Sequence, residues 1–475
     1  MSMVEARDLW EAVDAAAATG GRSRRDWQAT GVSIDSRSVG QGDLFVALTG
    51  PNRDGHGFVA HALRQGAAAA VVTRRPDDVD EDAPLLVVDD TQAALEALGR
   101  FGRARSCGKI VAITGSVGKT GTKEALRHVL GGFGRVHASA ASHNNHWGVP
   151  LTLANLAPAA EFAVAELGMN HAGEIRALTA MVRPHVAVIT TIAPAHLAFF
   201  EDTAAIARAK AEIFEGLEPG GTAILNADAP HADLLVEAAR ARAARVVLFG
   251  AAGEADVRLA ALDLEAGGSR LTVALGGRRL ELALAAPGRH WAMNSLAVLA
   301  VADCLGLDLA QAAARLGEVR PLAGRGGQRL LPWRGGRIRL LDESYNANPA
   351  SVTAALDVLG SQAGRRIAVL GDMLELGAGA ELLHAGLVHA VLAADAAKVF
   401  LAGPLMRGLF DALPPARRGA WAADSVALAP LVTAALEPGD VVLVKGSLGS
   451  AMRVVVEALD KAAAPAAALA EGRGR

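Results

Sequence analysis

The length, composition and charge of the chain exclude several classes of protein. Its 475 residues exceed what one ordinary hydrophobic core supports, so we expect two to four domains. The formal net charge of -3 gives no overall argument for a nucleic-acid partner, and two cysteines, Cys107 and Cys304, exclude a disulfide framework. The charged first residues lack the apolar segment of a signal peptide, and the apolar runs are too short to cross a bilayer. We therefore expect a cytoplasmic protein that binds no nucleic acid and has no membrane span.

Predicted strands and helices alternate along the chain, which is typical of α/β proteins with parallel sheets. Residues 1–89 contain a strand-rich stretch, GVSIDSRSVGQGDLFVALTG, followed by a helix that leads into a strand. We expect a small α/β domain over these residues.

Residues 90–319 form the largest predicted domain. After a helical connector, strands are predicted at KIVAIT, AEFAVAELG, PHVAVITTI and TAILNAD, with helices between them. The segment VRLAALDLEAGGSRLTVALGGRRLELALAAPG alternates apolar and polar residues between glycine turns, which predicts a strand meander in the same domain. A third, Rossmann-like α/β domain is predicted over residues 320–475, with strands at RIRLLDE, RRIAVLGD, KVFLAG and DVVLVKG.

A phosphate-binding loop is predicted at residues 113–124, where the sequence is ITGSVGKTGTKE. A strand that ends in a glycine turn, with Lys-Thr at the start of a helix, surrounds a phosphate with backbone N–H groups and the positive helix end. Ala112 replaces the usual first glycine, but the tight turn, the Lys119 charge and the Thr120 hydroxyl are retained. A chance glycine-rich turn is the alternative. The predicted nucleotide-binding residues are Gly115, Ser116, Val117, Gly118, Lys119, Thr120 and Gly121.

Three residues outside this loop are candidate partners of the phosphate site. Glu166 ends an apolar strand, where an NTPase places a carboxylate for Mg²⁺. His196 lies at another strand end, and Lys210 lies in the helix that follows. An isolated histidine is more often structural and an isolated helical lysine is more often solvated. Each of these residues alone is therefore weak evidence for a site, and only their combination supports one.

Segments spread over nearly the whole chain carry a family resemblance. They are TGSVGKTGTKE, SHNNHWGVPLTL, ELGMNHAGEI, ITTIAPAHL with AKAEIF, WAMNSLAVLAVA, DESYNANPAS, VLGDMLELG and VLVKGS. With these segments the chain resembles the Mur ligases. The segment SYNANP, which contains the only tyrosine of the chain, is similar to the family members that add D-alanyl-D-alanine. A polar turn in which Asn348-Pro349 starts a helix is the alternative interpretation of that segment.

The resemblance implies a site for ATP and two Mg²⁺ ions. Lys119, Glu166, His196 and Lys210 would be the catalytic residues, and the metal ligands would be Thr120, Glu166, His196 and Lys210. Lys210 matches a lysine that is carbamylated in the family, and the uptake of CO₂ by a neutral amine exchanges a cation for an anion suited to Mg²⁺.

Further nucleotide contacts implied by the resemblance are Asn294, Arg325, Asp342 and Glu343. For Asn294, a structural residue inside a helix is the alternative. Many relatives have two aspartates where this chain has Asp342-Glu343, so the carboxylate that meets the ATP ribose is displaced by one methylene.

The resemblance also implies substrate-binding residues. Those at the uridine-diphosphate end are Ser36, Arg37, Asp54 and His56, although their segments also occur in ordinary turns. Those suited to hydrogen bonding with an extended glycopeptide are His143, Asn144 and Asn145. Those on the dipeptide side are Tyr345, Asn346 and Asn348. Lys445 and Ser447 are further candidates, with a simple strand-end loop as the alternative, because Leu448 stands where many relatives have arginine.

The implied activity is ATP-dependent amide-bond formation for peptidoglycan synthesis, by a monomer. The expected substrates are UDP-N-acetylmuramoyl-tripeptide, activated as an acyl phosphate, and D-alanyl-D-alanine. Three alternatives stay open: a ligase that adds a single amino acid to the same precursor, a folylpolyglutamate-type synthetase, and a non-catalytic protein that binds a nucleotide or a UDP-sugar.

Overall fold

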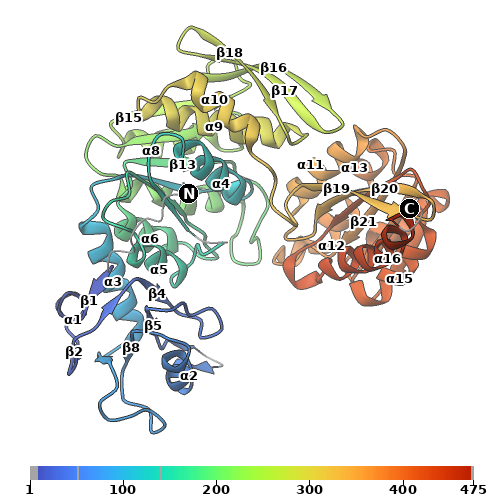
Figure 1. Ribbon diagram of the computed structural model, residues 1–475. Coiled ribbons are helices and arrows are strands. Elements are labelled where there is room, and N and C mark those ends of the chain that lie inside the picture. Colours follow the sequence, from blue (N-terminus) through green and yellow to red (C-terminus); the bar gives the residue numbers. More distant parts are fainter. Residues whose placement is uncertain (1–8, 51–52, 140–141, 472–475) are drawn as a thin grey trace.

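Three large sheets organise the chain in the computed structural model, which describes residues 9–50, 53–139 and 142–471 (Figure 1). In chain order the sheets have five, nine and six strands, and helices form most of the connections between parallel strands. The predicted α/β class is therefore confirmed. The boundaries that we propose, at residues 89/90 and 319/320, fall between β9 and α3 and between α10 and β19. Among the described residues, no helix is long and apolar enough to cross a membrane.

The N-terminal unit is a small sheet with strand order β2-β9-β8-β5-β4, in which only β2 is antiparallel to its neighbour. These strands are β2 (Arg22–Ser23), β9 (Leu85–Val87), β8 (Ala69–Val72), β5 (Asp43–Val46) and β4 (Gly31–Ser33). Two short antiparallel pairs join β1 (Trp10–Glu11) to β3 (Gln28–Ala29) and β6 (Thr49–Gly50) to β7 (Arg53–Asp54). The helices are α1 (Ala12–Thr19) and α2 (Val59–Arg64), and α3 (Thr91–Ala104) follows this unit as a connector.

Helix α3 attaches the N-terminal unit to the central one by packing on α5 (Gly148–Ala154). The helices approach closely because α3 has glycines at the contact: a Cβ on Gly102 would lie 2.2 Å from the Leu153 carbonyl oxygen. Asn155, just after α5, accepts from the Val32 N–H and donates to the Val32 carbonyl, each at 2.9 Å. The packing of α3 on α5 and the two hydrogen bonds between the Asn155 side chain and the Val32 backbone thus hold the two units together.

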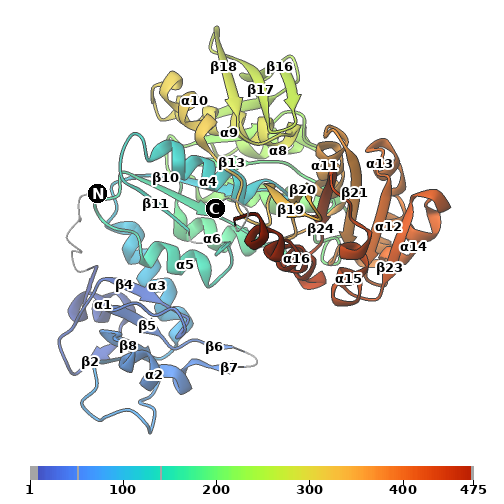
Figure 2. The same ribbon diagram turned by 45° about the vertical axis from the view of Figure 1, so that its right-hand side comes forward.

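The central sheet has the strand order β11-β12-β10-β13-β14-β15-β16-β17-β18. Its first seven strands are parallel: β11 (Val136–Ala138), β12 (Phe162–Glu166), β10 (Lys109–Thr114), β13 (Val186–Ile189), β14 (Thr222–Asn226), β15 (Arg245–Gly250) and β16 (Val257–Glu265). Strands β17 (Gly268–Leu275) and β18 (Arg278–Leu284) continue it antiparallel. The predicted meander corresponds to β16, β17 and β18, which project from the body of the unit (Figure 2).

Helices cover both faces of the central sheet. Side chains of α4 (Lys119–Leu130), α9 (Arg289–Cys304) and α10 (Leu309–Glu318) pack against Val111 and Ile113 on one face. Those of α6 (Glu174–Val182), α7 (Thr203–Ala211) and α8 (Ala232–Arg240) pack against Ile110 and Ala112 on the other. The alternation along β10 explains this division, because successive strand residues point to opposite faces.

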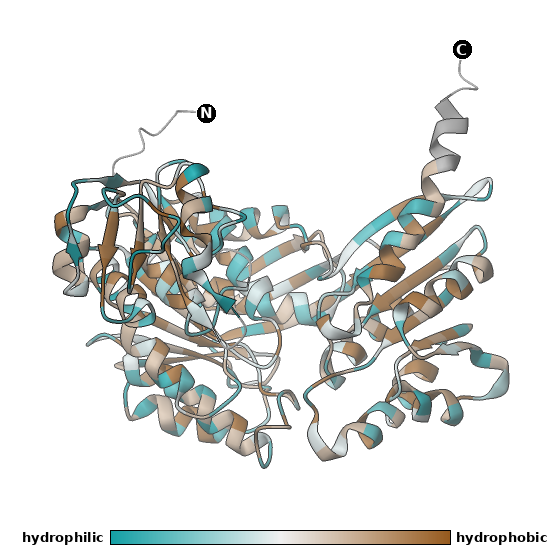
Figure 3. Cartoon of the chain, turned by 90° about the horizontal axis from the view of Figure 1, so that it is seen from below, coloured by the Kyte–Doolittle hydropathy of each residue, from teal (hydrophilic) through white to brown (hydrophobic). Residues whose placement is uncertain are grey.

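The C-terminal unit has the strand order β19-β20-β24-β21-β22-β23, and only β19 is antiparallel. The strands are β19 (Gly327–Trp333), β20 (Gly336–Glu343), β24 (Asp440–Lys445), β21 (Arg365–Gly371), β22 (Lys398–Ala402) and β23 (Arg418–Ala422). One face is covered by α11 (Pro349–Gly360), α12 (Ala380–Ala385), α13 (Val388–Ala393) and α14 (Met406–Ala412), and the other by α15 (Ser425–Ala435) and α16 (Arg453–Glu471). In Figure 3 the strands are largely brown and the connecting loops largely teal, as burial of apolar strands between helix layers requires.

Candidate active site

The predicted phosphate loop connects β10 to α4 at the carboxyl edge of the central sheet. Two of its glycines are required by space and backbone angle. Gly115 has φ +148°, and a Cβ there would lie 1.9 Å from Thr190 Oγ1; Gly118 has φ +88°, and a Cβ there would lie 2.7 Å from Asn294 Oδ1. Side chains at either position would be strained or would clash, which explains the glycine spacing.

Contacts to the loop after β13 hold the phosphate loop in shape. The Ser116 N–H donates to the Thr191 carbonyl at 2.9 Å, and the Ser116 hydroxyl donates to the Ala193 carbonyl at 3.0 Å. The Thr190 hydroxyl donates to the Val117 carbonyl at 2.5 Å. The loop is therefore fixed by its neighbours, and the N-terminal end of α4 faces the space above it.

Strand register brings Glu166 beside the phosphate loop. Glu166 pairs with Ile113 across β12 and β10, so the two parallel strands end at the same level. The carboxylate is 1% exposed; its Oε1 accepts from the Thr120 hydroxyl at 3.3 Å and from Asn144 Nδ2 at 2.9 Å. Its Oε2 is buried and has no hydrogen-bond partner among the described residues. A buried carboxylate oxygen left without a donor is costly unless a cation binds it, so this oxygen suits a metal ion.

Lys119 begins α4 and donates from Nζ to the Gly115 carbonyl at 2.7 Å, which curls the side chain over the loop. Burial lowers the pKa of Lys119 below its ordinary value, the Glu166 carboxylate acts in the opposite sense, and the Arg325 cation lowers it further. A bound anion would stabilise the charged form of Lys119. It would compensate for the lost hydration of the ammonium and for its repulsion by Arg325, as expected of a phosphate-binding lysine.

Lys210, in α7, is 1% exposed, and within the described ranges no hydrogen bond or ion pair to its Nζ is found. Burial and then the nearby Lys119 ammonium lower the pKa of Lys210 well below its ordinary value. A buried amine without a counter-ion is more stable in its neutral form. The surroundings of Lys210, near Lys119, therefore favour the neutral, nucleophilic form of its amine.

His196 lies in the loop after β13, and its Nδ1 is 2.7 Å from Glu375 Oε2. Burial lowers the pKa of His196; Lys119 adds to this effect, Glu375 opposes it, and Lys210 again lowers it. The neutral imidazole that results is the form that binds metals. In the part of the chain that the structure describes, no three His, Cys, Asp or Glu side chains cluster closely enough to hold a metal ion.

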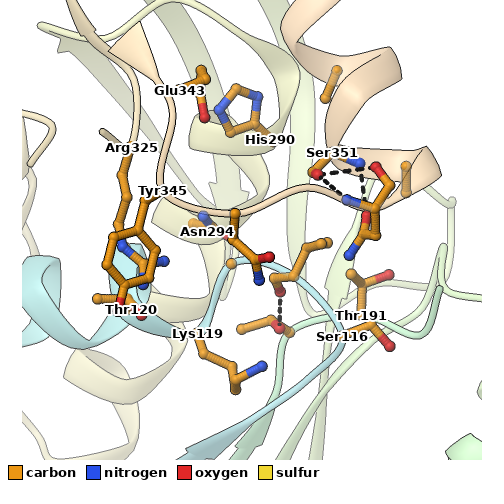
Figure 4. A pocket seen from close by; sticks show the side chains of 18 of the residues that line it. Ser116, Lys119, Thr120, Thr191, His290, Asn294, Arg325, Glu343, Tyr345 and Ser351 are labelled. Atoms are coloured by element: carbon orange, nitrogen blue, oxygen red, sulfur yellow. Dashed lines mark hydrogen bonds between the residues drawn. The ribbon is translucent and has the colours of Figure 1, made fainter. Parts of the chain in front are cut away.

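A cleft of about 910 Å³ opens over the phosphate loop and extends to the C-terminal unit (Figure 4). Its central wall contains residues from Ser116 to Gly121, with Asn144, Glu166, His196 and Asn294. The opposite wall contains Arg325, Glu343, Tyr345, Asn346, Asn348 and Lys445. Lys119, Glu166 and His196 thus share this cleft with the predicted acceptor residues of the other unit, whereas Lys210 does not line it.

Arg325 and Tyr345 form one edge of this cleft. The guanidinium carbon lies 3.9 Å from the centre of the tyrosine ring, and the side chains stack in Figure 4. Arg325 Nη2 also donates to Ser142 Oγ at 2.9 Å. This edge therefore joins the C-terminal unit to the loop before α5.

The two neighbouring acids at the end of β20 have different surroundings. Asp342 is buried, and its carboxylate accepts from the Ser344 hydroxyl at 2.6 Å and from the Gly324 N–H at 3.1 Å. Glu343 lines the cleft, and its Oε2 accepts from Lys445 Nζ at 3.3 Å. Of the two, only Glu343 has its carboxylate at the cleft, so it is the one placed to meet a ligand there.

Several predicted site residues serve the local structure. Asn348 caps α11 by accepting from the Ser351 N–H at 2.9 Å while also lining the cleft. Asn145 Oδ1 accepts from the Gly148 N–H at 2.9 Å at the start of α5. His143 is exposed, and it does not line the cleft. Of the triplet at residues 143–145, only Asn144 reaches the cleft. The Ser447 hydroxyl donates to the Ala347 carbonyl at 3.2 Å and accepts from the Leu374 N–H at 2.9 Å.

The predicted uridine-diphosphate residues lie in the N-terminal unit, away from the cleft lining. Arg37 is exposed and pairs with Asp35, with Nη2 2.6 Å from Oδ2, and Ser36 is partly exposed beside it. His56 is 3% exposed; its Nδ1 donates to Asp54 Oδ1 at 2.6 Å, and its Nε2 accepts from the Thr73 N–H at 2.9 Å. The two hydrogen bonds of His56 fix the ring, so His56 supports the shape of this region.

Sequence reasoning missed several cleft residues. Ser142, Asn170, Thr191, His290 and Trp291 line the cleft beside predicted ones. Each of these residues lies in or directly beside a segment that carries the family resemblance. That proximity in sequence is the feature from which they could have been predicted. Glu375 was missed as well, although it lies in the segment VLGDMLELG.

Comparison with known sequences identifies the family. Profiles of three domains match in chain order: "Mur ligase family, catalytic domain" at residues 28–103, "Mur ligase middle domain" at 113–302, and "Mur ligase, glutamate ligase domain" at 332–448. A curated UDP-N-acetylmuramoyl-tripeptide--D-alanyl-D-alanine ligase of Rickettsia prowazekii is 34% identical over 428 residues, or 90% of this chain and 94% of the relative. The chain belongs to the Mur ligase family.

Solved structures share the whole architecture of this Mur ligase. MurF from Acinetobacter baumannii superposes with a TM-score of 0.84 at 29% identity, covering 95% of this chain and 99% of that chain. MurF ligase from Thermotoga maritima, solved in complex with ADP, has a TM-score of 0.78 at 26% identity and covers 92% and 98%. The family resemblance and the three-domain architecture predicted from the sequence are therefore confirmed.

Proposed function

We propose that this Mur ligase joins D-alanyl-D-alanine to UDP-N-acetylmuramoyl-tripeptide, with ATP converted to ADP and phosphate. The product is the pentapeptide precursor of peptidoglycan. The observation that carries the proposal is the cleft, in which Lys119 and Glu166 face Tyr345 and Asn346. Nucleotide activation and acceptor binding can therefore occur at one place. The similarity to curated ligases of this activity over nine-tenths of the chain supports the same assignment.

ATP serves to activate a carboxylate, which is a poor electrophile. An oxygen of the tripeptide carboxylate attacks the γ-phosphorus, the bond to the β-phosphate oxygen breaks, and ADP leaves an acyl phosphate behind. Lys119 and the N–H groups of the phosphate loop hold the phosphates and offset the repulsion between two anions. Asn294, Arg325 and Glu343, at the cleft, complete the nucleotide site in this proposal.

Metal binding fits the polar groups beside the phosphate loop. The partnerless Oε2 of Glu166 and the adjacent Thr120 hydroxyl provide the hard oxygen ligands that Mg²⁺ prefers. We propose that Thr120, Glu166, His196 and Lys210 together hold two Mg²⁺ ions, which supply neutralising charge to the phosphates when bound.

The buried amine of Lys210 supports carbamylation. Neutral Lys210 Nζ can attack CO₂, forming an N–C bond and losing a proton, so that a partnerless base becomes an anion. Burial, and then the nearby Lys119 ammonium, lower the pKa of Lys210, whereas a carbamate anion at this position would be attracted to that ammonium. It also adds the second anionic group, beside Glu166, that a two-metal site needs.

The dipeptide amine must reach the acyl phosphate while water is excluded. Its nitrogen attacks the acyl carbon, the bond from that carbon to the phosphate oxygen breaks, and the nitrogen loses a proton. Tyr345, Asn346 and Asn348 lie on the cleft wall of the C-terminal unit and would orient the dipeptide. Closure of the cleft between the two walls would protect the acyl phosphate from hydrolysis.

The N-terminal unit is proposed to bind the uridine-diphosphate end. Exposed Arg37, with Ser36 beside it, can exchange its Asp35 partner for the pyrophosphate as a planar multi-donor cation. Asp54 and His56 would hold the neighbouring turn, and His143, Asn144 and Asn145 would lie along the path of the glycopeptide. Because one chain supplies all of these residues, we propose that the enzyme acts as a monomer, in the cytoplasm where ATP and UDP-sugars are made.

Phosphate release from ATP tests the assignment. The assay contains UDP-N-acetylmuramoyl-tripeptide and compares D-alanyl-D-alanine with single D- and L-amino acids, with Lys119→Ala as the inactive control. Release only with the dipeptide supports the proposal. Release with a single amino acid would move the assignment to a neighbouring ligase, and ATP binding without release with any acceptor would favour a non-catalytic protein.

A further inference from the structure

One contact between the central and C-terminal units lies directly at a proposed metal ligand. His196 Nδ1 is 2.7 Å from Glu375 Oε2, although 179 residues separate them in sequence. His196 belongs to the loop after β13, and Glu375 belongs to the segment between β21 and α12. This pair is outside the roles given to Glu166, Lys119 and Lys210 above.

The backbone at this contact is held in an uncommon conformation. His196 has φ +58° and Glu375 has φ +62°, both in the left-handed region that non-glycine residues avoid. The Ala198 N–H donates to the Glu375 carbonyl at 3.1 Å, and the Phe199 N–H donates to the His196 carbonyl at 2.9 Å. Such conformations are unfavourable for non-glycine residues and persist where surrounding contacts over-determine them. Here the hydrogen bond from Ala198 to Glu375 crosses from one unit to the other.

The segment that carries Glu375 is fixed to the C-terminal unit. The Met373 N–H donates to the buried ring of His384 at 2.9 Å, and the Leu374 N–H donates to Ser447 Oγ at 2.9 Å. Just before them, the Asp372 carboxylate accepts from the Met406 N–H at 2.9 Å. Glu375 must therefore move with the C-terminal unit whenever that unit moves.

The chemistry of the pair favours one tautomer of His196. An ionised carboxylate only accepts, so Nδ1 carries the hydrogen and donates it to Glu375, and Nε2 keeps its lone pair. A histidine that binds a metal through one nitrogen commonly donates the other N–H to a carboxylate, which fixes ring orientation and raises basicity.

We propose that Glu375 is a positioning residue for His196, so that the His196 metal ligand is correctly oriented only when the C-terminal unit is seated against the central unit. The proposal rests on the metal role given to His196 under the proposed function. Contact of the C-terminal unit, which carries the proposed dipeptide-binding residues, with the central unit would then also orient the metal ligand His196. Phosphoryl transfer is then favoured when the acceptor wall is in place.

The first test measures Mn²⁺ binding by electron paramagnetic resonance, with ADP held saturating, in the wild type, Glu375→Ala, Glu375→Gln, His196→Ala and Glu381→Ala. Glu381 is an exposed glutamate at the start of α12 and is the matched control. We expect Glu375→Ala to weaken Mn²⁺ binding about tenfold or more, and Glu375→Gln, which retains an acceptor oxygen, to lose less. Glu381→Ala should match the wild type.

The second test uses small-angle scattering to measure the radius of gyration of the ligand-free protein. Glu375→Ala should increase it, whereas Glu381→Ala should not.

Unchanged Mn²⁺ affinity in Glu375→Ala, while His196→Ala weakens it, would overturn the positioning role alone. Unchanged affinity in His196→Ala would overturn the metal assignment and this inference with it. Equal losses in Glu375→Gln and Glu375→Ala would also overturn it, provided that thermal melts show both variants folded.

Discussion

The guanidinium carbon of Arg325 lies 3.9 Å from the centre of the Tyr345 ring, and Arg325 Nη2 donates to Ser142 Oγ at 2.9 Å. Arg325 precedes β19 and Tyr345 follows β20, whereas Ser142 lies in the central unit. The stacked pair thus joins a proposed nucleotide contact to a proposed acceptor contact within the C-terminal unit, and the Arg325–Ser142 hydrogen bond connects this pair to the central unit.

This stacking predicts different results for two substitutions of Tyr345. Tyr345→Phe keeps the ring and loses only a long contact, from the hydroxyl to Ser142 Oγ at 3.5 Å, so kcat/KM should stay within about twofold of the wild type. Tyr345→Ala removes the stacking surface, which is worth about 1–2 kcal/mol in a desolvated site, and should lower kcat/KM about 5- to 30-fold. Steady-state phosphate release with D-alanyl-D-alanine checks both. Equal losses in the two variants would assign the effect to the hydroxyl.

Loss of the buried amine at Lys210 should remove most activity. Lys210→Ala takes away the proposed carbamate, and a short exogenous carboxylate such as acetate should restore part of the rate by occupying the space left behind. Lys210→Arg, which keeps a cation and cannot form the carbamate, should be inactive without rescue. Phosphate release over a range of acetate concentrations is the measurement. An unimpaired Lys210→Ala variant would remove Lys210 from the site.

Lys119→Ala should separate the two substrate sites. The variant loses the charge that offsets phosphate repulsion, so acyl-phosphate formation should fall by about 100-fold or more. Binding of UDP-N-acetylmuramoyl-tripeptide should stay within about threefold, because its uridine end is proposed to lie on the N-terminal unit. Isothermal calorimetry measures the binding, and capture of the acyl phosphate with hydroxylamine measures the chemistry. Loss of both would contradict the proposed division of the chain.

The two cysteines should differ in reactivity. Burial raises the pKa of Cys304 to about 11, so its thiol stays protonated near neutral pH, and at about pH 8 only about a thousandth is thiolate. Exposed Cys107 has no such shielding from reagent. In a Cys107→Ser variant, the alkylation rate of Cys304 should be slow and should rise about tenfold per pH unit up to that pKa. A rate that is fast and flat with pH would mean that the Cys304 thiol is less shielded in solution than in the structure.

Local motifs made the phosphate site predictable from sequence. The turn from Gly115 to Gly118 and the Lys119-Thr120 helix start depend on neighbouring residues, and Glu166 follows from the rule that parallel strands end at one edge. The α/β class follows from alternating elements in the same way. The family resemblance extended this to Tyr345 and Asn294, both of which line the cleft.

Positions that depend on local competition for hydrogen bonds were less predictable. Asp342 and Glu343 are adjacent, yet Asp342 bonds to Ser344 and Gly324 while Glu343 lines the cleft. In the same way, Asn145 accepts from the Gly148 N–H at the start of α5, while its neighbour Asn144 donates to Glu166. Residue type and motif alone do not reveal which of two neighbouring side chains hydrogen-bonds to the local structure and which one faces the cleft.

By itself, then, the sequence determined the fold class, the phosphate loop and the family, because these follow from backbone preferences and side chains close together in the chain. Only the tertiary structure decided which distant residues meet. Glu375 reaches His196 across 179 residues, and Arg325 reaches Ser142 across 183. The physical reason is that such contacts depend on how separately folded units pack, and neither a strand period nor a glycine turn encodes that packing.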